Sequence, residues 1–326
     1  MVRRAIVRDI GEKRRLAMRI GIDLGGTKIE GIVMDACGRI VHRKRVSTPT
    51  NGVYAEIVSA IGDLVNELES RSRERCSVGV GTPGALSART GRLKNSNTLS
   101  LTGKPIKQDL EIMLDREVRL ENDANCFTLS EAIDGAARDH GLVFGVIMGT
   151  GVGGGIVIDN NLHSGPQHIA GEWGHNTLVA DGRPCYCGRR GCVETYLSGP
   201  GLVAEWAEQS GDRGSATAKQ IVELALNGDE HCRSAMEKYI EYFARAMAVV
   251  INILDPDAIV LGGGMSNLQA LYESGRRRIA DYVFNDELTT PILPNRHGDS
   301  SGVRGAAWLW PPPVNGGRPD PVHDTV

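Results

Sequence analysis

The sequence predicts an α/β fold of two domains, each built around a sheet of similar design. The chain has 326 residues, which exceeds one domain of ordinary size. Two segments, residues 18–41 and 147–161, share the pattern of strand, glycine turn and strand. When the second strands of the two segments are aligned, Gly25 falls opposite Gly149. This repetition, once in each half of the chain, indicates a duplicated architecture.

The composition argues against several classes of protein. Hydrophobic residues make up 41%, aromatic residues 5%, and there are 41 glycines, as in an α/β protein rich in tight turns. No apolar run is long enough to span a bilayer, and a net charge of −3 provides no global attraction for nucleic acid or anionic lipid. The seven cysteines do not resemble a disulfide framework. We therefore expect a cytoplasmic protein without membrane or nucleic-acid partners.

Both ends of the chain are predicted to lie outside the folded domains. Residues 1–17 include six basic side chains but lack the apolar centre of a signal peptide. They are interpreted as a loose extension before a natural start at Met18. The tail at 311–326 is rich in proline and polar residues, which predicts disorder.

Hydrophobic periodicity and turn residues define the elements between these ends. They are, in order, an amphipathic crossover helix at 57–68, a short strand at 77–81 before a Pro83-Gly84 turn, a strand ending at 121–123, a helix from about Ala124, a mostly helical region from about 199 to 254, a buried strand ending at 262–264, and a closing helix that contains Trp308.

The two glycine turns suit the binding of phosphate. Gly25 and Gly26 allow a tight turn whose backbone N–H groups, with Thr27 and Lys28, can contact an anion. Taken alone, this DLGGTK segment is equally compatible with a plain hairpin. The second turn also satisfies the G-x-G-x-x-G pattern of dinucleotide-binding dehydrogenases, with an acidic residue downstream at Glu172. That fingerprint requires a helix at the glycines, whereas β-prone residues follow here, so a dehydrogenase is disfavoured.

Asp123 lies where a strand passes into a helix. Carboxylates at the carboxyl end of a parallel strand occupy the usual ligand-binding edge of α/β sheets. The alternative is that Asp123 only caps the helix, which is the commoner role of aspartate at such a position. A second amide nearby, Asn125, favours a chemical role.

A short segment at 171–194 combines soft metal ligands with turn residues. His175, Cys185, Cys187 and Cys192 form a Cys₃His set that can close a tetrahedral zinc site. Four protein ligands leave no open position, so the ion would be structural. Two carboxylates, Glu172 and Glu194, bracket the set. The alternatives are reduced thiols without a metal, or a disulfide pair.

The motifs taken together resemble the ROK family of sugar kinases and repressors. DLGGTK, GTGVGGG, AGEWGH, CYCGRRGCVET and LGGGMS occur in the family's order between Met18 and Trp310. LENDANC, CYCGRRGCVET, NILDPDAIVLGGGMSN and HGDSSGVRGAAWLW look particularly like the bacterial fructokinases of the family, also called mannofructokinases. The resemblance implies the two-domain actin/hexokinase-like (ribonuclease H-like) fold with duplicated mixed sheets. We expect a smaller domain at 18–123, a larger one at 124–301 that carries the zinc loop, and a helix at about 302–310 packed back on the first.

The resemblance also implies roles for individual residues. Asp123 matches the family's general base. The sugar contacts would be Asn97, Asn122, Asp123, Glu172, His175 and Glu194, and ATP with Mg²⁺ would bind at Asp23, Gly25, Gly26, Thr27, Lys28, Gly149, Thr150, Gly151, Gly262, Gly263 and Gly264. One departure concerns the sugar pocket: many relatives have an aromatic residue after the asparagine that matches Asn97, whereas this chain has Thr98 and Leu99.

The predicted activity is ATP-dependent phosphorylation of a hexose at its 6-hydroxyl, with D-fructose as the substrate and fructose 6-phosphate as the product. Glucokinase, mannokinase and N-acetylhexosamine kinase are the alternatives within the same chemistry. A sugar-responsive repressor of the family would require an N-terminal helix-turn-helix domain, for which the 17 residues before Met18 are too few. The partners would be a sugar and ATP, with a homodimer as an open option.

Overall fold

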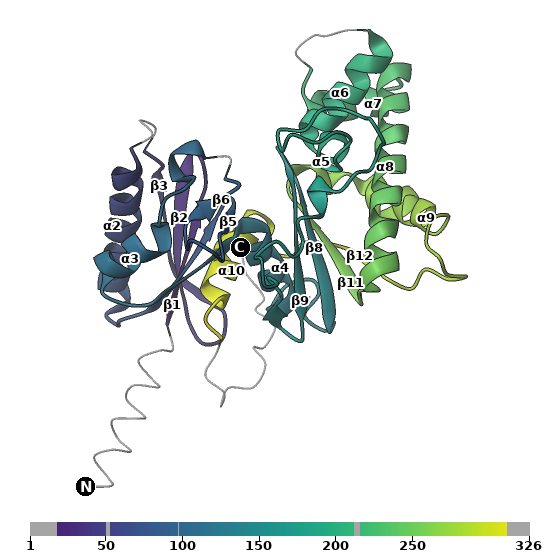
Figure 1. Cartoon of the computed structure of the whole chain (residues 1–326). Coiled ribbons are helices and arrows are strands. Elements are labelled where there is room, and N and C mark those ends of the chain that lie inside the picture. Colours follow the sequence, from purple (N-terminus) through teal and green to yellow (C-terminus); the bar gives the residue numbers. More distant parts are fainter. Residues whose placement is uncertain (1–17, 50–52, 97, 212–215, 312–326) are drawn as a thin grey trace, which may run out of the picture. The chain divides into compact units, whose positions relative to one another are not determined.

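The computed structural model describes residues 18–49, 53–96, 98–211 and 216–311. The predictions for the basic segment 1–17, for Asn97 and for the tail from 312 fall outside these residues. The chain divides into two compact units, each with its own five-stranded sheet (Figure 1). Of the described residues, the first unit comprises those within 18–138, 164–169 and 299–311, and the second comprises those within 139–163 and 170–298.

The sheet of the first unit has the strand order β3-β2-β1-β4-β7. The strands are β1 (Arg19–Leu24), β2 (Lys28–Met34), β3 (Ile40–Ser47), β4 (Ser77–Thr82) and β7 (Val118–Asn122). β2 pairs antiparallel with both β1 and β3, whereas β4 pairs parallel with β1 and β7. A two-stranded hairpin of β5 (Ala85–Leu86) and β6 (Leu93–Lys94) follows β4.

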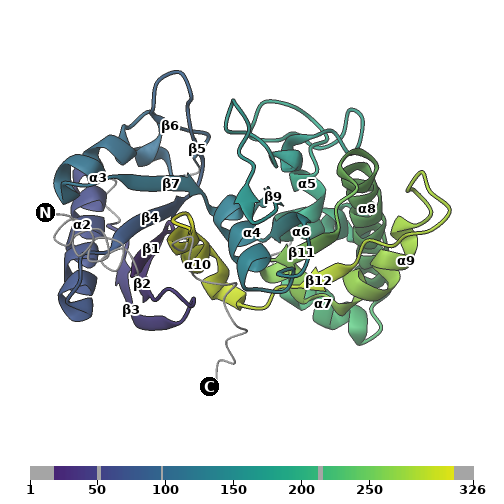
Figure 2. The same ribbon diagram turned by 90° about the horizontal axis from the view of Figure 1, so that it is seen from below.

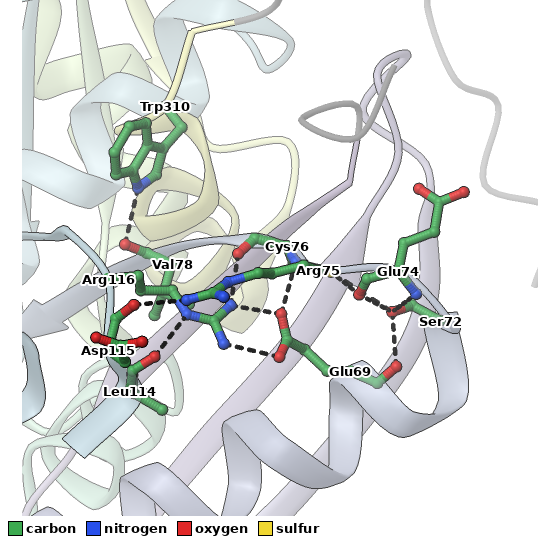
Figure 3. A network of polar contacts seen from close by, with 10 residues as sticks. All are labelled: Glu69, Ser72, Glu74, Arg75, Cys76, Val78, Leu114, Asp115, Arg116 and Trp310. Carbon is green, nitrogen blue, oxygen red and sulfur yellow. Dashed lines mark hydrogen bonds and ion pairs between the residues drawn. The ribbon is translucent and has the colours of Figure 1, made fainter. Parts of the chain in front are cut away.

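Two helices, α2 (Tyr54–Ser72) and α3 (Ile106–Leu114), lie together on one side of this sheet (Figure 2). α2 is the predicted crossover helix, and its apolar stripe is buried at Ile57, Val58, Ile61, Leu64, Val65 and Leu68. Its last turn is tied to β4 by a polar network (Figure 3). Glu69 accepts hydrogen bonds from Arg116 Nη2 at 2.9 Å and from the Cys76 backbone N–H at 2.6 Å. Arg116 also donates to the Cys76 carbonyl at 2.9 Å, so the ends of three elements are joined.

The sheet of the second unit has the order β10-β9-β8-β11-β12. Its strands are β8 (Leu142–Met148), β9 (Val152–Ile158), β10 (Asn161–Leu162), β11 (Ala258–Gly262) and β12 (Ile292–Pro294). Its helices are α5 (Glu194–Leu197), α6 (Gly199–Ser210), α7 (Ala218–Leu226), α8 (Glu230–Leu254) and α9 (Arg276–Ile279). The region expected to be helical from 199 to 254 thus comprises α6, α7 and α8. The apolar stripe of α8, including Phe243, Met247 and Ile251, is part of the core of this unit.

The two sheets share one topology. β9 pairs antiparallel with β8 and β10, and β11 pairs parallel with β8 and β12, as β2 and β4 do in the first unit. Each sheet therefore begins with an antiparallel hairpin whose turn contains the predicted glycines. The mixed sheets and their duplication follow the pattern that the two glycine segments predicted.

The C-terminal helix α10 (Ser301–Trp308) belongs to the first unit and lies beside α4 (Asp123–Ile133) (Figures 1 and 2). Its backbone packs directly on the sheet. A Cβ at Gly21 would lie 2.1 Å from the Val303 carbonyl oxygen, and one at Gly79 would lie 1.9 Å from that of Ala306. Gly305 approaches α4 in the same way, because its Cβ would lie 1.6 Å from the Cys126 carbonyl oxygen.

Because of these contacts, the boundary between the units lies at a later residue than the sequence indicated. The sequence placed it after residue 123, but α4 packs against α10 and is part of the first unit up to residue 138. Residues 164–169 also join the first unit, where Ser164 Oγ donates to Glu121 Oε1 at 2.8 Å. None of the helices in the described part of the chain combines the length and apolar composition needed to cross a membrane.

Candidate functional site

The predicted site residues fall into two groups, one in each unit. The first unit carries Asp23, Gly25, Gly26, Thr27, Lys28, Asn122 and Asp123. The second carries Gly149, Thr150, Gly151, Glu172, His175, Cys185, Cys187, Cys192, Glu194, Gly262, Gly263 and Gly264.

Asp123 begins α4 at the carboxyl end of β7. Its neighbour Asn122 is the N-cap residue, and its side chain accepts from the Ala124 N–H at 2.8 Å. Asp123 Oδ1 also accepts from that N–H at 2.8 Å, although its side chain is exposed. Asn122 and Asp123 thus both accept a hydrogen bond from the first turn of α4.

Asp23, at the end of β1, lies close enough to Asp123 for the two carboxylates to repel each other. The pKa of Asp23 is raised to about 7, first by burial and then by repulsion from Asp123 and Glu30. A negative charge at Asp23 is thus unfavourable in this environment. A cation near the pair would offset that cost, so the donor set fits a divalent metal that carries phosphate ligands.

The turn between β1 and β2 is closed by its own backbone. Gly25 N–H donates to the Lys28 carbonyl at 3.0 Å, and Thr48 Oγ1 donates to the Gly25 carbonyl at 2.7 Å. Gly26, Thr27 and Lys28 are exposed. A Cβ at Gly26 would meet no atom within 4 Å, so packing inside the protein does not require glycine there.

The matching turn of the second unit lies beside a large cavity. Gly149 N–H donates to the Gly151 carbonyl at 2.9 Å, and the Gly149 carbonyl accepts from the Gly199 N–H at 2.8 Å, which ties the turn to the start of α6. As at Gly26, a Cβ at Gly149 or Gly264 would meet no atom within 4 Å. The cavity has a volume of about 1210 Å³, and its lining includes Gly149, Thr150, Val203, Ala207, Val222, Gly264 and Leu268. Predominantly apolar walls with a few polar groups are typical of a small-molecule site.

At the remaining predicted glycines, the fold itself explains why glycine or a small residue is present. Gly263 adopts a φ of +79°, in the left-handed region, and a Cβ there would lie 2.4 Å from the Met148 carbonyl oxygen. A Cβ at Gly151 would lie 2.6 Å from Glu194 Oε2. Both positions thus hold β8 and its turn in place. Gly262 is the buried last residue of β11.

The four predicted metal ligands meet in one cluster. One ligand atom from each of His175, Cys185, Cys187 and Cys192 lies within 4.8 Å of all the others. His175 Nδ1 is 3.6 Å from Cys185 Sγ, and Cys187 Sγ is 3.6 Å from Cys192 Sγ. All seven cysteines are free, so the disulfide alternative does not hold in this structure. Three thiols and one imidazole at this spacing fit a tetrahedral zinc ion.

The loop around the cluster has a second anchor that the sequence did not indicate. Arg183 donates to Glu205 at 2.7 Å and to Glu208 at 2.8 Å, and it lies over the Tyr196 ring with 4.6 Å between guanidinium and centroid. It also donates to the Thr195 carbonyl at 3.1 Å. One arginine among the three in the segment carries no periodic signal, so sequence reasoning did not single out Arg183.

Glu194 connects the loop of the Cys₃His cluster to the second glycine turn. Its Oε2 accepts from the Val152 N–H at 3.0 Å, and its Oε1 is 4.0 Å from Cys185 Sγ. His175 and Glu172 lie in and beside a single turn of 3₁₀ helix, Trp173–His175, and all three polar side chains are half-buried. Tyr186, which the sequence also did not indicate, completes this face.

The model of the ROK family matches residues 19–312 of this chain. The chain belongs to the ROK family. It is 40% identical over 302 residues to the N-acetyl-D-glucosamine kinase of Salmonella newport (strain SL254), an alignment that covers 90% of this chain and 99% of that kinase.

Two solved ROK structures show the same fold. The ROK hexokinase from Thermus thermophilus superposes with a TM-score of 0.81 at 30% identity, covering 89% of this chain and 96% of that one. The ROK family glucokinase from Streptomyces griseus, solved with glucose and AMPPNP, gives a TM-score of 0.74 at 30% identity over 90% and 98% of the two chains. The predicted hexokinase-type fold is thereby confirmed.

The prediction of a fructokinase is not supported. The 40% identical ROK relatives are N-acetyl-D-glucosamine kinases, in Citrobacter koseri as in Salmonella. The motifs that suggested fructose include the segment around Asp123 and the Cys₃His segment. The similarity to N-acetyl-D-glucosamine kinases and a glucokinase shows that these motifs do not indicate which sugar is bound.

Proposed function

We propose that this ROK protein transfers the γ-phosphoryl group of ATP to the 6-hydroxyl of N-acetyl-D-glucosamine. The observation that carries the choice of sugar is the 40% identity to N-acetyl-D-glucosamine kinase over 99% of that enzyme's length. Glucose is the second candidate, because the Streptomyces griseus glucokinase is 30% identical over 98% of its chain.

Asp123 is proposed as the general base. It would accept the proton of the sugar 6-hydroxyl as that oxygen bonds to the γ-phosphorus, and the bond from phosphorus to the β–γ bridging oxygen would break to release ADP. The exposed position of Asp123 at the start of α4 supports this role. Asp23 is proposed to orient the magnesium ion, which would neutralise charge on the phosphates.

ATP is proposed to bind the two glycine turns and the cavity of the second unit. Gly26, Gly149 and Gly264 each leave open space where a side chain would otherwise stand, as phosphate or adenosine approaching the backbone requires. The apolar walls of the cavity suit an adenine ring. Gly25, Thr27, Lys28, Thr150 and Gly151 would complete the phosphate contacts.

The sugar is proposed to contact Asn122, Glu172, His175 and Glu194, together with Asn97, which lies outside the described residues. Buried sugar hydroxyls need paired donors and acceptors, and these carboxylate, amide and imidazole groups supply them. A structural zinc held by His175, Cys185, Cys187 and Cys192 would fix His175 and the nearby Glu194 in place.

A coupled assay of ADP release tests this function. N-acetylglucosamine, glucose, mannose, N-acetylmannosamine and fructose would be compared at equal concentration. We expect the highest kcat/KM with N-acetylglucosamine and phosphate on its 6-oxygen. A higher value with glucose would move the assignment to the second candidate. Sugar binding without phosphorylation of any hexose would reject the kinase and favour a sugar-responsive regulator.

A further inference from the structure

Tyr186 makes two contacts with the predicted zinc ligand His175. It stands between Cys185 and Cys187 and is 73% exposed, an unusual position for a large aromatic side chain. Its Oη lies 3.1 Å from His175 Nε2. The two rings meet edge to face, with centroids 5.2 Å apart and an interplanar angle of 81°. Tyr186 therefore contacts the imidazole through both its ring and its hydroxyl.

The two nitrogens of His175 face different partners. Nδ1 is the nitrogen beside the thiols, 3.6 Å from Cys185 Sγ. Nε2 is the nitrogen beside Tyr186. A neutral imidazole that gives its Nδ1 lone pair to a metal carries its proton on Nε2. In that tautomer, Nε2–H donates to Tyr186 Oη.

We infer that Tyr186 is a positioning residue of the sugar site, which fixes the tautomer and the ring orientation of His175 through its hydroxyl. The part of the inference that concerns sugar binding rests on the proposed function. The part that concerns metal binding does not. A partner on the second imidazole nitrogen orients the ring and raises its basicity toward the metal. The hydroxyl of Tyr186 accepts one hydrogen bond from His175 and still has its own proton to donate to a sugar oxygen, so that the contribution of His175 to sugar binding would pass through this hydroxyl.

The position of Glu194 connects this pair to the rest of the sugar-binding face. Its Oε1 is 4.0 Å from Cys185 Sγ, the thiol next to Tyr186 in sequence. Its Oε2 is held by the Val152 N–H at 3.0 Å. The imidazole of His175 and the carboxylate of Glu194 thus both approach the thiol of Cys185, the residue that precedes Tyr186. A change at Tyr186 should alter both metal affinity and sugar binding.

Zinc affinity is the first test. Tyr186→Phe keeps the ring contact and removes only the hydroxyl, whereas Tyr186→Ala removes both. Tyr282→Phe is the matched control, since Tyr282 is also exposed in the second unit and its hydroxyl bonds to Glu241, away from the cluster. In competition with a chromophoric chelator, we expect Tyr186→Phe to weaken zinc binding about 10-fold or more, and the control to stay within about twofold. A Tyr186→Phe protein that binds zinc as tightly as the parent would overturn the inference, as would a parent that binds none.

The tautomer can be observed directly. In a long-range ¹H–¹⁵N spectrum of histidine-labelled, zinc-loaded protein, assigned with His175→Gln, we expect a metal-bound Nδ1 and a protonated Nε2. Metal coordination through Nε2 would contradict the geometry on which the inference stands.

Steady-state kinetics at saturating zinc distinguish a role of Tyr186 in sugar binding from a general loss of enzyme activity. Loss of one hydrogen bond to the sugar should raise the KM for the sugar by about 3- to 10-fold in Tyr186→Phe, with kcat within about twofold. An unchanged KM would reject the role in sugar binding. If the parent phosphorylates no hexose and Tyr186→Phe still weakens zinc binding, the proposed function fails while the positioning of His175 stands.

Discussion

At the scale of single residues, the carboxylate pair of Asp23 and Asp123 has the clearest physical signature. An aspartate normally ionises near pH 4, but the pKa of Asp23 is raised to about 7 by burial and by its acidic neighbours. Ionising this buried carboxylate beside other acidic groups destabilises the ligand-free protein at neutral pH. Such a cost is typical of functional sites, where a ligand offsets it.

The pH dependence of stability tests this reading. A folded-state pKa above the unfolded value means that the contribution of Asp23 is full below about pH 4 and is lost as pH rises through about 7. At about 1.4 kcal/mol per pKa unit, the loss is at most about 4 kcal/mol. We therefore expect Asp23→Asn to be more stable than the parent at pH 8, and the difference to vanish near pH 4, in urea unfolding without ligands. Asp63→Asn, an exposed position on α2, is the control and should follow the parent. If the unfolding free energies of Asp23→Asn and the parent changed with pH in parallel, the raised pKa of Asp23 would be refuted.

At the scale of elements, glycines divide into those required by packing and those that leave open space. Gly305 brings α10 against α4, where a Cβ would lie 1.6 Å from the Cys126 carbonyl oxygen. A backbone atom cannot move aside as the end of a side chain can. Gly26, in the turn between β1 and β2, has no neighbour within 4 Å of a Cβ.

This difference predicts opposite effects of the same substitution. Gly305→Ala should lower the free energy of unfolding by about 1–3 kcal/mol or more, because it forces a backbone shift. Gly26→Ala should leave the unfolding free energy within about 0.5 kcal/mol of the parent. It should instead raise the KM for ATP, because the methyl group occupies the proposed phosphate position. Urea unfolding and steady-state kinetics on both variants check this. Normal ATP kinetics in Gly26→Ala would remove that turn from the nucleotide site.

The zinc loop is the second element with a direct test. The purified protein should contain about one zinc per chain, since the Cys₃His set closes one tetrahedral site. Cys187→Ser should lose most of this zinc, whereas Cys232→Ser, at a buried thiol outside the cluster, should retain it. Elemental analysis of the three proteins measures the content. Active parent protein without zinc would show that Arg183 and the loop's backbone contacts suffice to hold the segment.

At the scale of the whole molecule, the sequence predicted repeated local patterns well and long-range packing poorly. The two glycine hairpins, the helix α2 and the Cys₃His cluster follow from spacing and residue type alone. The boundary after residue 138 does not, because it depends on Gly305 meeting Cys126, residues far apart in the chain. Arg183 and Tyr186 were missed because single side chains in irregular loops carry no period. The preference for fructose found no support, because the quoted motifs do not distinguish this chain from a family whose similar members include N-acetyl-D-glucosamine kinases and a glucokinase.

The most direct test of the whole account compares turnover and binding in Asp123→Asn. This substitution keeps the size and polarity of the side chain but removes its basicity. We expect kcat for N-acetylglucosamine to fall by about 10²–10⁴-fold. Calorimetry should show the sugar and the nucleotide binding with affinities close to those of the parent. A near-normal kcat in Asp123→Asn would contradict the assignment of this aspartate as the base and, with it, the proposed mechanism.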